Sequence, residues 1–206
     1  MKKIIITILL LTISLSAAEL TDYQTKYLKS FVLEEKKSYI EAINKLVEIY
    51  PKYRYDYEIN LRLGWLSHLN KEYKNSVKYL KIAMKINTNA IEPLNMILLP
   101  LTNLKNIKEA EKYSSIVIKK SSGNYYAHLR IAYFYYTINK FDKALYHYKI
   151  LNSFFPSDIS VKLGMASTLL KLKKYEKARS FYIEILKVSP YHQTAYRGYL
   201  ASFAKK

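Results

Sequence analysis

One bulky, mostly apolar residue returns every 34 positions along most of this chain. It occupies five positions without any insertion: Tyr39, Tyr73, Ile107, Phe141 and Tyr175. A small residue follows each one three places later: Ala42, Ser76, Ala110, Ala144 and Ala178. A fixed period of this length is typical of stacked copies of one supersecondary unit, in which each copy buries its apolar face against its neighbours. The spacing predicts a repeat protein in which the bulky residues lock each copy together.

Each copy divides into two helical segments around a short polar turn, and the fourth copy shows this best. Its first segment has apolar residues at helical spacing: Leu129, Ala132, Tyr133 and Tyr136. The turn is Asn139-Lys140, and the second segment carries a further set: Phe141, Ala144, Leu145, Tyr148 and Leu151. Pro156 cannot continue the second helix, and Asp158 is suited to cap the next one.

Five such helix pairs and one further helix account for nearly all of residues 19–206. We expect repeats at 23–56, 57–90, 91–124, 125–158 and 159–192, followed by a capping helix at 193–205. Small residues in the first helices allow a close approach to the second helices: Gly64, Ala132 and Ala166. The sequence therefore predicts an all-α fold, an α-solenoid that winds as a right-handed superhelix.

The third repeat departs from the pattern because Pro93 and Pro100 both fall in its first helix. Pro100 lies inside the helical pattern, where a proline costs about 3 kcal/mol and should kink the helix. The bend either shapes a binding surface or marks a decayed repeat that its neighbours tolerate.

The residue pattern of this repeat resembles that of the tetratricopeptide repeat (TPR) family. That family has 34 residues per repeat, with Leu-Gly or Leu-Ala in the first helix, and an aromatic residue, an alanine, another aromatic residue and a proline after it. The matching residues are Leu63-Gly64, Ile131-Ala132 and Met165-Ala166, then Phe141/Ala144/Tyr148/Pro156 and Tyr175/Ala178/Tyr182/Pro190. The family's tryptophan in the first helix is absent. The resemblance covers residues 23–192 and implies a non-enzymatic scaffold that binds another protein or a peptide.

In TPR arrays, the first helices line a concave surface on which a peptide lies. Carried over, the resemblance gives nine candidate groove residues: Tyr27, Phe31, Arg62, Trp65, Asn95, Arg130, Tyr133, Tyr136 and Lys171. Aromatic rings supply contact area at low entropic cost, and arginine binds carboxylates through two hydrogen bonds. Packing between repeats is the alternative role of each ring. One subclass grips a C-terminal carboxylate with a set of Lys, Asn and Arg residues that this chain does not hold, which disfavours a chaperone-tail adaptor.

The first 18 residues have the pattern of a secretory signal peptide. Met1-Lys2-Lys3 is positively charged, the stretch from Ile4 to Leu15 is apolar, and Ser16-Ala17-Ala18 offers small residues for cleavage. We expect export to a bacterial periplasm, or secretion beyond it. The alternative is an uncleaved N-terminal anchor, although the apolar run is shorter than the roughly 20 residues that span a bilayer.

The formal net charge is +18, and the lysines fall mainly on the second helices and the turns. Such a charge attracts nucleic acid, anionic lipid or an acidic protein. Export disfavours nucleic acid. Weak association of a basic convex face with an anionic membrane or cell-wall surface is an alternative function, and a merely solvated face is the simpler reading.

No motif for catalysis, metal binding or cofactor binding is present. The four histidines have no paired ligand spacing, and the chain has no cysteine. It also lacks a glycine-rich phosphate loop and a nucleophile elbow. We therefore expect a scaffold or adaptor in an envelope process such as assembly, secretion or wall remodelling; a regulatory partner of an envelope enzyme is the other alternative.

Overall fold

The computed structural model describes residues 20–203, and within this range every regular element is an α-helix. The eleven helices are α1 (Asp22–Glu35), α2 (Tyr39–Tyr53), α3 (Tyr57–Leu69), α4 (Tyr73–Ile86), α5 (Glu92–Asn103), α6 (Ile107–Lys120), α7 (Tyr125–Thr137), α8 (Phe141–Phe154), α9 (Ile159–Lys171), α10 (Tyr175–Val188) and α11 (Gln193–Ala201). The predicted all-α solenoid is confirmed. The predicted signal peptide, residues 1–18, lies outside the described residues.

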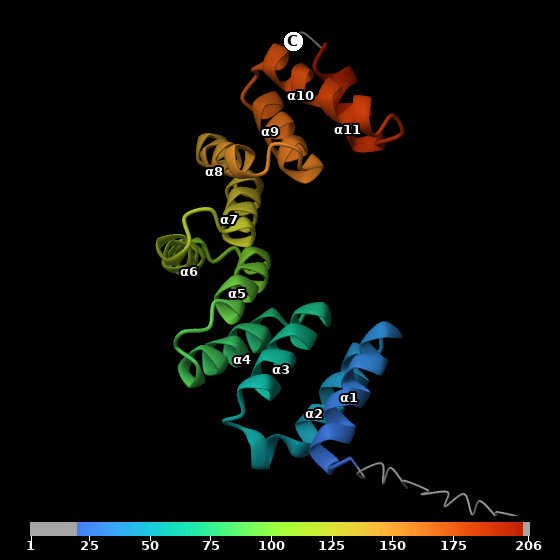
Figure 1. Ribbon diagram of the computed structural model, residues 1–206, viewed down its shortest axis with the longest axis vertical. Helices are drawn as coiled ribbons and strands as arrows, with labels where there is room; N and C mark the ends of the chain where they lie inside the picture. Colours follow the sequence, from blue (N-terminus) through green and yellow to red (C-terminus); the bar gives the residue numbers. More distant parts are fainter. Residues whose placement is uncertain (1–19, 204–206) are drawn as a thin grey trace, which may run out of the picture.

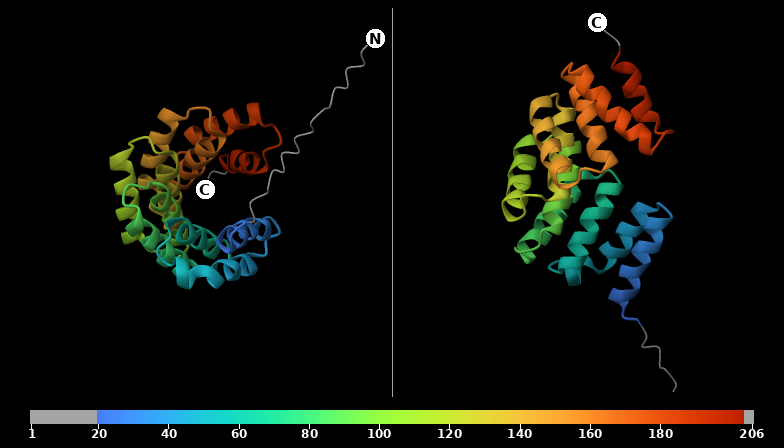
Figure 2. Two further views of the ribbon diagram at one scale, coloured as in Figure 1. Left: turned by 60° about the horizontal axis from the view of Figure 1, so that its bottom comes forward. Right: turned by 45° about the horizontal axis from the view of Figure 1, so that its top comes forward.

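The helices form five successive pairs, α1/α2 to α9/α10, and α11 packs against the last pair. The pairs stack along a curved path, so the molecule is an elongated arc (Figure 1) that curls towards a ring when it is turned (Figure 2). Helices α5, α7 and α9 lie on the inner side of the arc, while α6 and α8 lie on its outer side. The first helix of each pair is thus placed to form a concave surface. The final helix ends at Ala201, before the end of the predicted range 193–205.

The small residue of the 34-residue period is the one that locks each helix pair. Its five side chains are all buried, with exposed fractions of 0–1%: Ala42, Ser76, Ala110, Ala144 and Ala178. Ser76 also donates a hydrogen bond of 2.7 Å from its hydroxyl to the main-chain oxygen of Gly64. A Cβ atom on Gly64 would meet the Leu80 side chain at 2.6 Å, so the expected close approach is confirmed.

The bulky residue of the period lies at the edge of each helix pair and is less buried than the sequence suggests. Each one is the first residue of a second helix, as Tyr39 is of α2 and Tyr175 is of α10. All five are only half-buried. A side chain at the start of a helix lies beside the turn, where one edge of the ring stays in solvent. Two of them still contact the first helix of their own pair, since Phe141 packs on Tyr136 and Tyr73 on His68, so they share the contact within the pair with the buried small residues.

The turn inside each pair has the same backbone conformation in all five repeats. One residue of each turn has a positive φ between 53° and 63°: Lys37, Lys71, Lys105, Asn139 and Lys173. These positions are also 34 apart. The first turn shows the hydrogen bonds, since the Ser38 N–H donates to the Leu33 oxygen at 2.9 Å and the Lys37 N–H to the Glu34 oxygen at 2.7 Å. This is a Schellman ending of the first helix, formed here without the glycine that usually occupies the left-handed position.

Aspartates at the joints between repeats cap a helix and hold the preceding repeat. Asp158 accepts a hydrogen bond from the Val161 N–H at 2.9 Å, which confirms its predicted capping role, and another from the Tyr125 hydroxyl at 3.0 Å. Asp56 likewise accepts a hydrogen bond from the Ile59 N–H at 2.9 Å and another from the Tyr23 hydroxyl at 3.2 Å. Because each tyrosine begins the repeat before, these bonds fix the stacking of neighbouring repeats.

The third repeat stacks like the others. Pro93 lies in the first turn of α5, where a missing backbone N–H leaves no hydrogen bond unmade. Pro100 lies in the last turn and is buried, and α5 continues past it to Asn103. A role of this repeat in shaping the groove stays a prediction.

Candidate functional site

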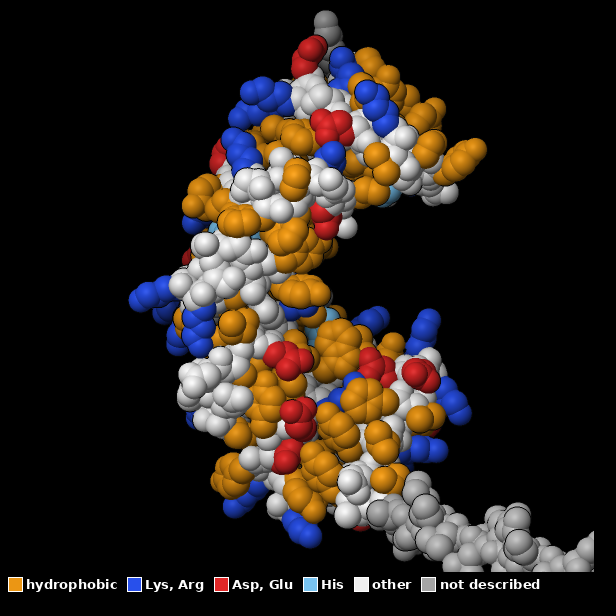
Figure 3. All heavy atoms as spheres, viewed as in Figure 1, with side chains coloured by type: hydrophobic (Ala, Val, Ile, Leu, Met, Phe, Trp, Pro, Cys, Tyr) orange, Lys and Arg blue, Asp and Glu red, His pale blue; other side chains and the backbone are white. Residues whose placement is uncertain are grey.

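A cavity of about 840 Å³ opens on the inner side of the arc, between α5, α7 and α9. We call it the inner cavity. Its lining is mainly aromatic and aliphatic: His68, Leu99, Thr102, Asn103, Lys105, Tyr126, Leu129, Arg130, Tyr133, Tyr136, Thr137, Ile138, Tyr148, Ile159, Ser160, Leu163, Gly164, Ser167 and His192. Figure 3 shows hydrophobic side chains and a histidine along the hollowed side of the molecule.

Two tyrosines of α7 expose large parts of their rings to this cavity. Tyr126 is 55% exposed and Tyr133 is 56% exposed. Tyr136 is half-buried and packs edge-on against Phe141, with 5.6 Å between ring centroids. Tyr148 is buried, and burial raises the pKa of its hydroxyl. The two exposed rings are therefore free to contact a ligand, while the other two support the wall.

Arg130 is the half-buried cation of the inner cavity. Its Nη1 donates a hydrogen bond to the main-chain oxygen of Asn95, and its Cζ lies 5.3 Å from the centroid of the Tyr126 ring. Among residues 20–203, no carboxylate forms an ion pair with it. Burial lowers the pKa of the Arg130 guanidinium, yet arginine stays protonated at neutral pH. The cavity therefore carries a positive charge that the described chain does not neutralise.

Two polar atoms beside Arg130 also lack a partner within the described residues. They are the Nδ1 of His68 and the Oδ1 of Asn95, both of which are buried atoms. Burial, together with the charge of Arg130, lowers the pKa of His68. The His68 ring is therefore neutral at pH 7.

A second, smaller cavity of about 590 Å³ lies at the other end of the arc, and we call it the α1–α3 cavity. Its lining is Phe31, Glu34, Glu35, Lys37, Tyr39, Arg62, Trp65 and Leu69. Arg62 is only 7% exposed and forms an ion pair with Glu34 through Nη1. Its Cζ lies 3.6 Å from the centroid of the Phe31 ring, and its Nε donates to the Ser30 hydroxyl at 3.0 Å.

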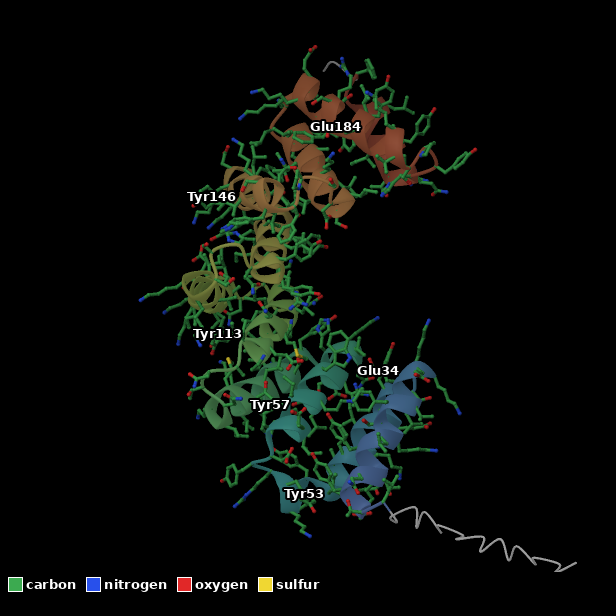
Figure 4. The ribbon with its side chains drawn as sticks, in the orientation of Figure 1. Glu34, Tyr53, Tyr57, Tyr113, Tyr146 and Glu184 are labelled. Carbon is green, nitrogen blue, oxygen red and sulfur yellow. The ribbon has the colours of Figure 1, made fainter. Side chains whose placement is uncertain are left out.

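Glu34 is therefore the central group of the α1–α3 cavity. Figure 4 labels it between α1 and α3. Besides Arg62, its carboxylate accepts a hydrogen bond of 2.6 Å from the indole N–H of Trp65. The charge of Arg62 is thus neutralised inside the protein, and its main contacts join the first repeat to the second.

The nine candidate residues separate into three groups. Arg130, Tyr133 and Tyr136 line the inner cavity, with Asn95 next to Arg130. Phe31, Arg62 and Trp65 line the α1–α3 cavity. Tyr27 and Lys171 line neither cavity. The Tyr27 ring stacks on Tyr23 with 5.8 Å between centroids, and Lys171 is exposed at the C-terminal end of α9.

The sequence argument missed several residues of the inner cavity. His68 and Thr102 occupy the same repeat position as Tyr136, so the 34-residue period could have identified them. Tyr126 was missed because it lies one turn before the residues at helical spacing. His192 lies in the connection to α11, where the repeat pattern ends.

Two histidines that are distant in sequence meet on the outer side of the fourth repeat. The Nδ1 atoms of His128 and His147 are 3.0 Å apart, and the His147 ring stacks on Tyr135. Burial, followed by the charges of His128 and Lys143, lowers the pKa of His147 to about 4. Within the described residues, no third His, Cys, Asp or Glu joins them to make a metal site.

The outer surface is basic, as predicted. Exposed lysines follow the second helices and the turns: Lys74, Lys78, Lys85, Lys108, Lys112, Lys119, Lys120, Lys173, Lys174 and Lys177. The turn residue Lys105 is also exposed, but it lines the inner cavity. None of the described helices is long and apolar enough to cross a membrane.

No protein-family model matches the chain, and no curated protein matches its sequence. Solved structures do match its fold. A tetratricopeptide repeat protein from Parabacteroides merdae ATCC 43184 aligns with a TM-score of 0.75 at 14% identity, over 88% of this chain and 72% of that one. MamA from Desulfovibrio magneticus RS-1 aligns with a TM-score of 0.73 at 14% identity, over 85% and 99% of the two chains.

YrrB, described as a TPR protein with an unusual peptide-binding site, aligns with a TM-score of 0.65 at 14% identity, over 84% of this chain and 89% of YrrB. These likenesses concern the arrangement of helices, which agrees with the helix pairs, the turns and the small-residue positions described above. The chain has the tetratricopeptide-repeat fold.

Proposed function

We propose that this protein is a non-enzymatic scaffold that binds a segment of another protein in its inner cavity. The observation that carries the proposal is the cavity itself, which α5, α7 and α9 line with aliphatic side chains and into which α7 exposes the rings of Tyr126 and Tyr133. Exposed aromatic rings next to an arginine are typical of the residues that dominate protein interfaces. YrrB, a TPR protein with a peptide-binding site, supports the proposal that this chain also binds a peptide.

We further propose that the protein acts in the cell envelope. The support comes from residues 1–18, whose charged start, apolar stretch and small residues fit a secretory signal peptide. The partner would then be a protein of the same compartment, in a process such as assembly, secretion or wall remodelling.

The exposed lysines of the outer surface favour a second candidate function, which is association with an anionic membrane or wall polymer. Such binding would be electrostatic and would weaken as salt screens the charges. Sedimentation with anionic vesicles over a salt series tests it. Binding at low salt that the inner-cavity variants leave unchanged would support this second function.

Affinity capture with the full chain, tagged at its C-terminus, tests the scaffold function. We expect the double variant Tyr126→Ala/Tyr133→Ala to capture its partner about tenfold less well, because both rings are exposed in the cavity. The matched control is Tyr55→Ala/Tyr146→Ala, which removes two exposed rings, 72% and 62% exposed, that lie outside the inner cavity. Figure 4 shows Tyr146 on the outer side of α8. Equal capture by both double variants would contradict binding in the inner cavity.

A further inference from the structure

We propose that the inner cavity binds an acidic segment of a partner protein, in which a carboxylate lies next to apolar side chains, and that Arg130 anchors this carboxylate. The inference rests on the proposed function, since it names the kind of segment that the same cavity takes. It comes from a comparison of the two cavities, which are built from equivalent positions of the repeat.

Seven of the eight residues that line the α1–α3 cavity have an equivalent two periods later that lines the inner cavity. The pairs are Phe31 and Leu99, Glu34 and Thr102, Glu35 and Asn103, Lys37 and Lys105, Arg62 and Arg130, Trp65 and Tyr133, and Leu69 and Thr137. Both basic residues are kept, and both acidic residues are replaced by neutral ones. The α1–α3 cavity thus has balanced charges, whereas the inner cavity has two cations and no Asp or Glu in its lining.

In the α1–α3 cavity, the arginine and the aromatic residue at these repeat positions both donate hydrogen bonds to one carboxylate. The Glu34 carboxylate accepts from Arg62 and from the indole N–H of Trp65. The equivalent donors in the inner cavity are the guanidinium of Arg130 and the hydroxyl of the exposed Tyr133. The residue equivalent to Glu34 is Thr102, whose hydroxyl donates instead to the main-chain oxygen of Leu98 at 2.7 Å. The inner cavity therefore has a side chain that can donate at each of the two equivalent positions and lacks the carboxylate.

The guanidinium of Arg130 has a free edge for such a carboxylate. Only its Nη1 has a hydrogen-bond acceptor among the described residues, the oxygen of Asn95. Its Nε and Nη2 lie on the same edge of the planar group, and this edge binds a carboxylate through two parallel hydrogen bonds. In Arg62 the Nε is used by Ser30, but the equivalent of Ser30 is Leu98, which has no side-chain acceptor. Because Arg130 is half-buried, the attraction is stronger than at an open surface.

The rest of the lining defines the other part of the ligand. Aliphatic side chains from α5, α7 and α9 surround the arginine: Leu99, Leu129, Ile159 and Leu163. A ligand that only carried charge would leave these groups uncovered, so the carboxylate must be accompanied by apolar side chains. The net charge of +18 also attracts an acidic partner before contact.

The test uses the immobilised full chain and a synthetic library of random octapeptides that are acetylated at the N-terminus and amidated at the C-terminus. We expect retained peptides to be enriched in Asp or Glu beside Leu, Ile or Phe. Fluorescence anisotropy then compares a retained peptide with a twin in which Gln replaces the acidic residue. We expect the twin to bind at least about tenfold more weakly, because it loses charge-assisted hydrogen bonds. A third peptide, with Gln and a free C-terminus, shows whether a terminal carboxylate serves equally well.

Two substitutions at one position separate charge from size. Thr102→Glu places a carboxylate where Glu34 has one, so we expect it to pair with Arg130 and to weaken binding of the acidic peptide at least about tenfold. Thr102→Gln adds the same volume without the charge, so the further loss from Thr102→Gln to Thr102→Glu, which we expect to be at least about fivefold, measures the effect of the charge alone. Thermal melts followed by circular dichroism check that both variants fold.

Equal binding of the Gln twin, or equal loss in Thr102→Gln and Thr102→Glu, would overturn the inference. If the retained peptides still depend on Tyr126 and Tyr133, the proposed function survives that result. If the double variant Tyr126→Ala/Tyr133→Ala binds the peptides unchanged, or if no peptide is retained, the proposed function fails as well.

Discussion

Arg62 and Arg130 occupy the same position of the repeat, two periods apart, but the protein uses them in opposite ways. Arg62 is buried and neutralised by Glu34, so its contacts join the first two repeats. Arg130 is half-buried and has no ion pair within residues 20–203. The difference comes from the residue 28 positions earlier, which is Glu34 in one case and Thr102 in the other. One substitution in a neighbouring repeat thus decides whether an inward-facing arginine stabilises the fold or is left to bind a ligand.

Removing the Glu34 carboxylate from the α1–α3 cavity should have the largest effect on the stability of the protein. Glu34→Gln leaves the buried charge of Arg62 uncompensated, so we expect the free energy of unfolding to fall by about 2–4 kcal/mol. Urea denaturation measures this change. The control is Glu35→Gln, at an exposed neighbour that forms no ion pair in the described range, where we expect a change below about 0.5 kcal/mol. A loss in Glu34→Gln as small as that in Glu35→Gln would show that Arg62 does not need its partner.

The position of Arg62 and Arg130 in the repeat is occupied by Gly164 in the fifth repeat. Replacing this glycine should have the next largest effect on the free energy of unfolding. A Cβ atom on Gly164 would lie well inside van der Waals contact with the Tyr148 ring. Gly164→Ala would usually favour a helix, but here we expect a loss of about 1–3 kcal/mol from overpacking. Thermal or urea denaturation measures it. In a Tyr148→Leu background the substitution should no longer destabilise, and a persistent loss there would point to another cause.

Glycine substitutions in the two turns that border the cavities should change the free energy of unfolding by equal amounts. These changes should be smaller than that of Gly164→Ala. Lys37 and Lys105 both have a left-handed backbone, which costs about 1–2 kcal/mol for a residue with a side chain. We expect Lys37→Gly and Lys105→Gly each to raise the free energy of unfolding by about 0.5–1 kcal/mol, since glycine adopts this conformation without strain but loses more entropy on folding. Lys36→Gly, at a right-handed position, is the control and should not stabilise. A gain at Lys37 alone would mean that the two turns are not equivalent.

The smallest expected effect is a pKa change that reports the charge of Arg130. Burial is the main reason for the lowered pKa of His68, and the positive charge of Arg130 is the second, because it disfavours a charged imidazolium. Thr102→Glu should neutralise Arg130, so the pKa of His68 should rise. NMR titration of the histidine ring protons measures this shift. The pKa of His147, which burial lowers most and the charges of His128 and Lys143 lower further, should stay near 4. An unchanged His68 would show that the introduced carboxylate does not reach Arg130.

The 34-residue period predicted most of the fold because the contacts within one helix pair repeat with it. The small residues, the turns at Asn139 and Lys173, and the cap at Asp158 all depend on neighbours close in sequence. The burial of Tyr39 and Tyr175 was misjudged, because a position at the start of a helix leaves part of the ring beside the turn. The period alone does not show how far a side chain extends into the neighbouring repeat.

The candidate site was predicted only in part, for a related reason. Tyr133 and Arg130 were predicted on the inner helices from helical spacing and the family resemblance, and both line the inner cavity. The pairing of Arg62 with Glu34, and of His128 with His147, crosses between helices at separations that no local pattern indicates.

The sequence by itself determined the number of helix pairs, their boundaries and the surface that faces inward, since these follow from periodicity and short-range hydrogen bonding. Only the tertiary structure decided which inward arginine is neutralised. A charge is cancelled by whichever carboxylate comes within a few ångströms, and in a stacked array that carboxylate belongs to the neighbouring repeat.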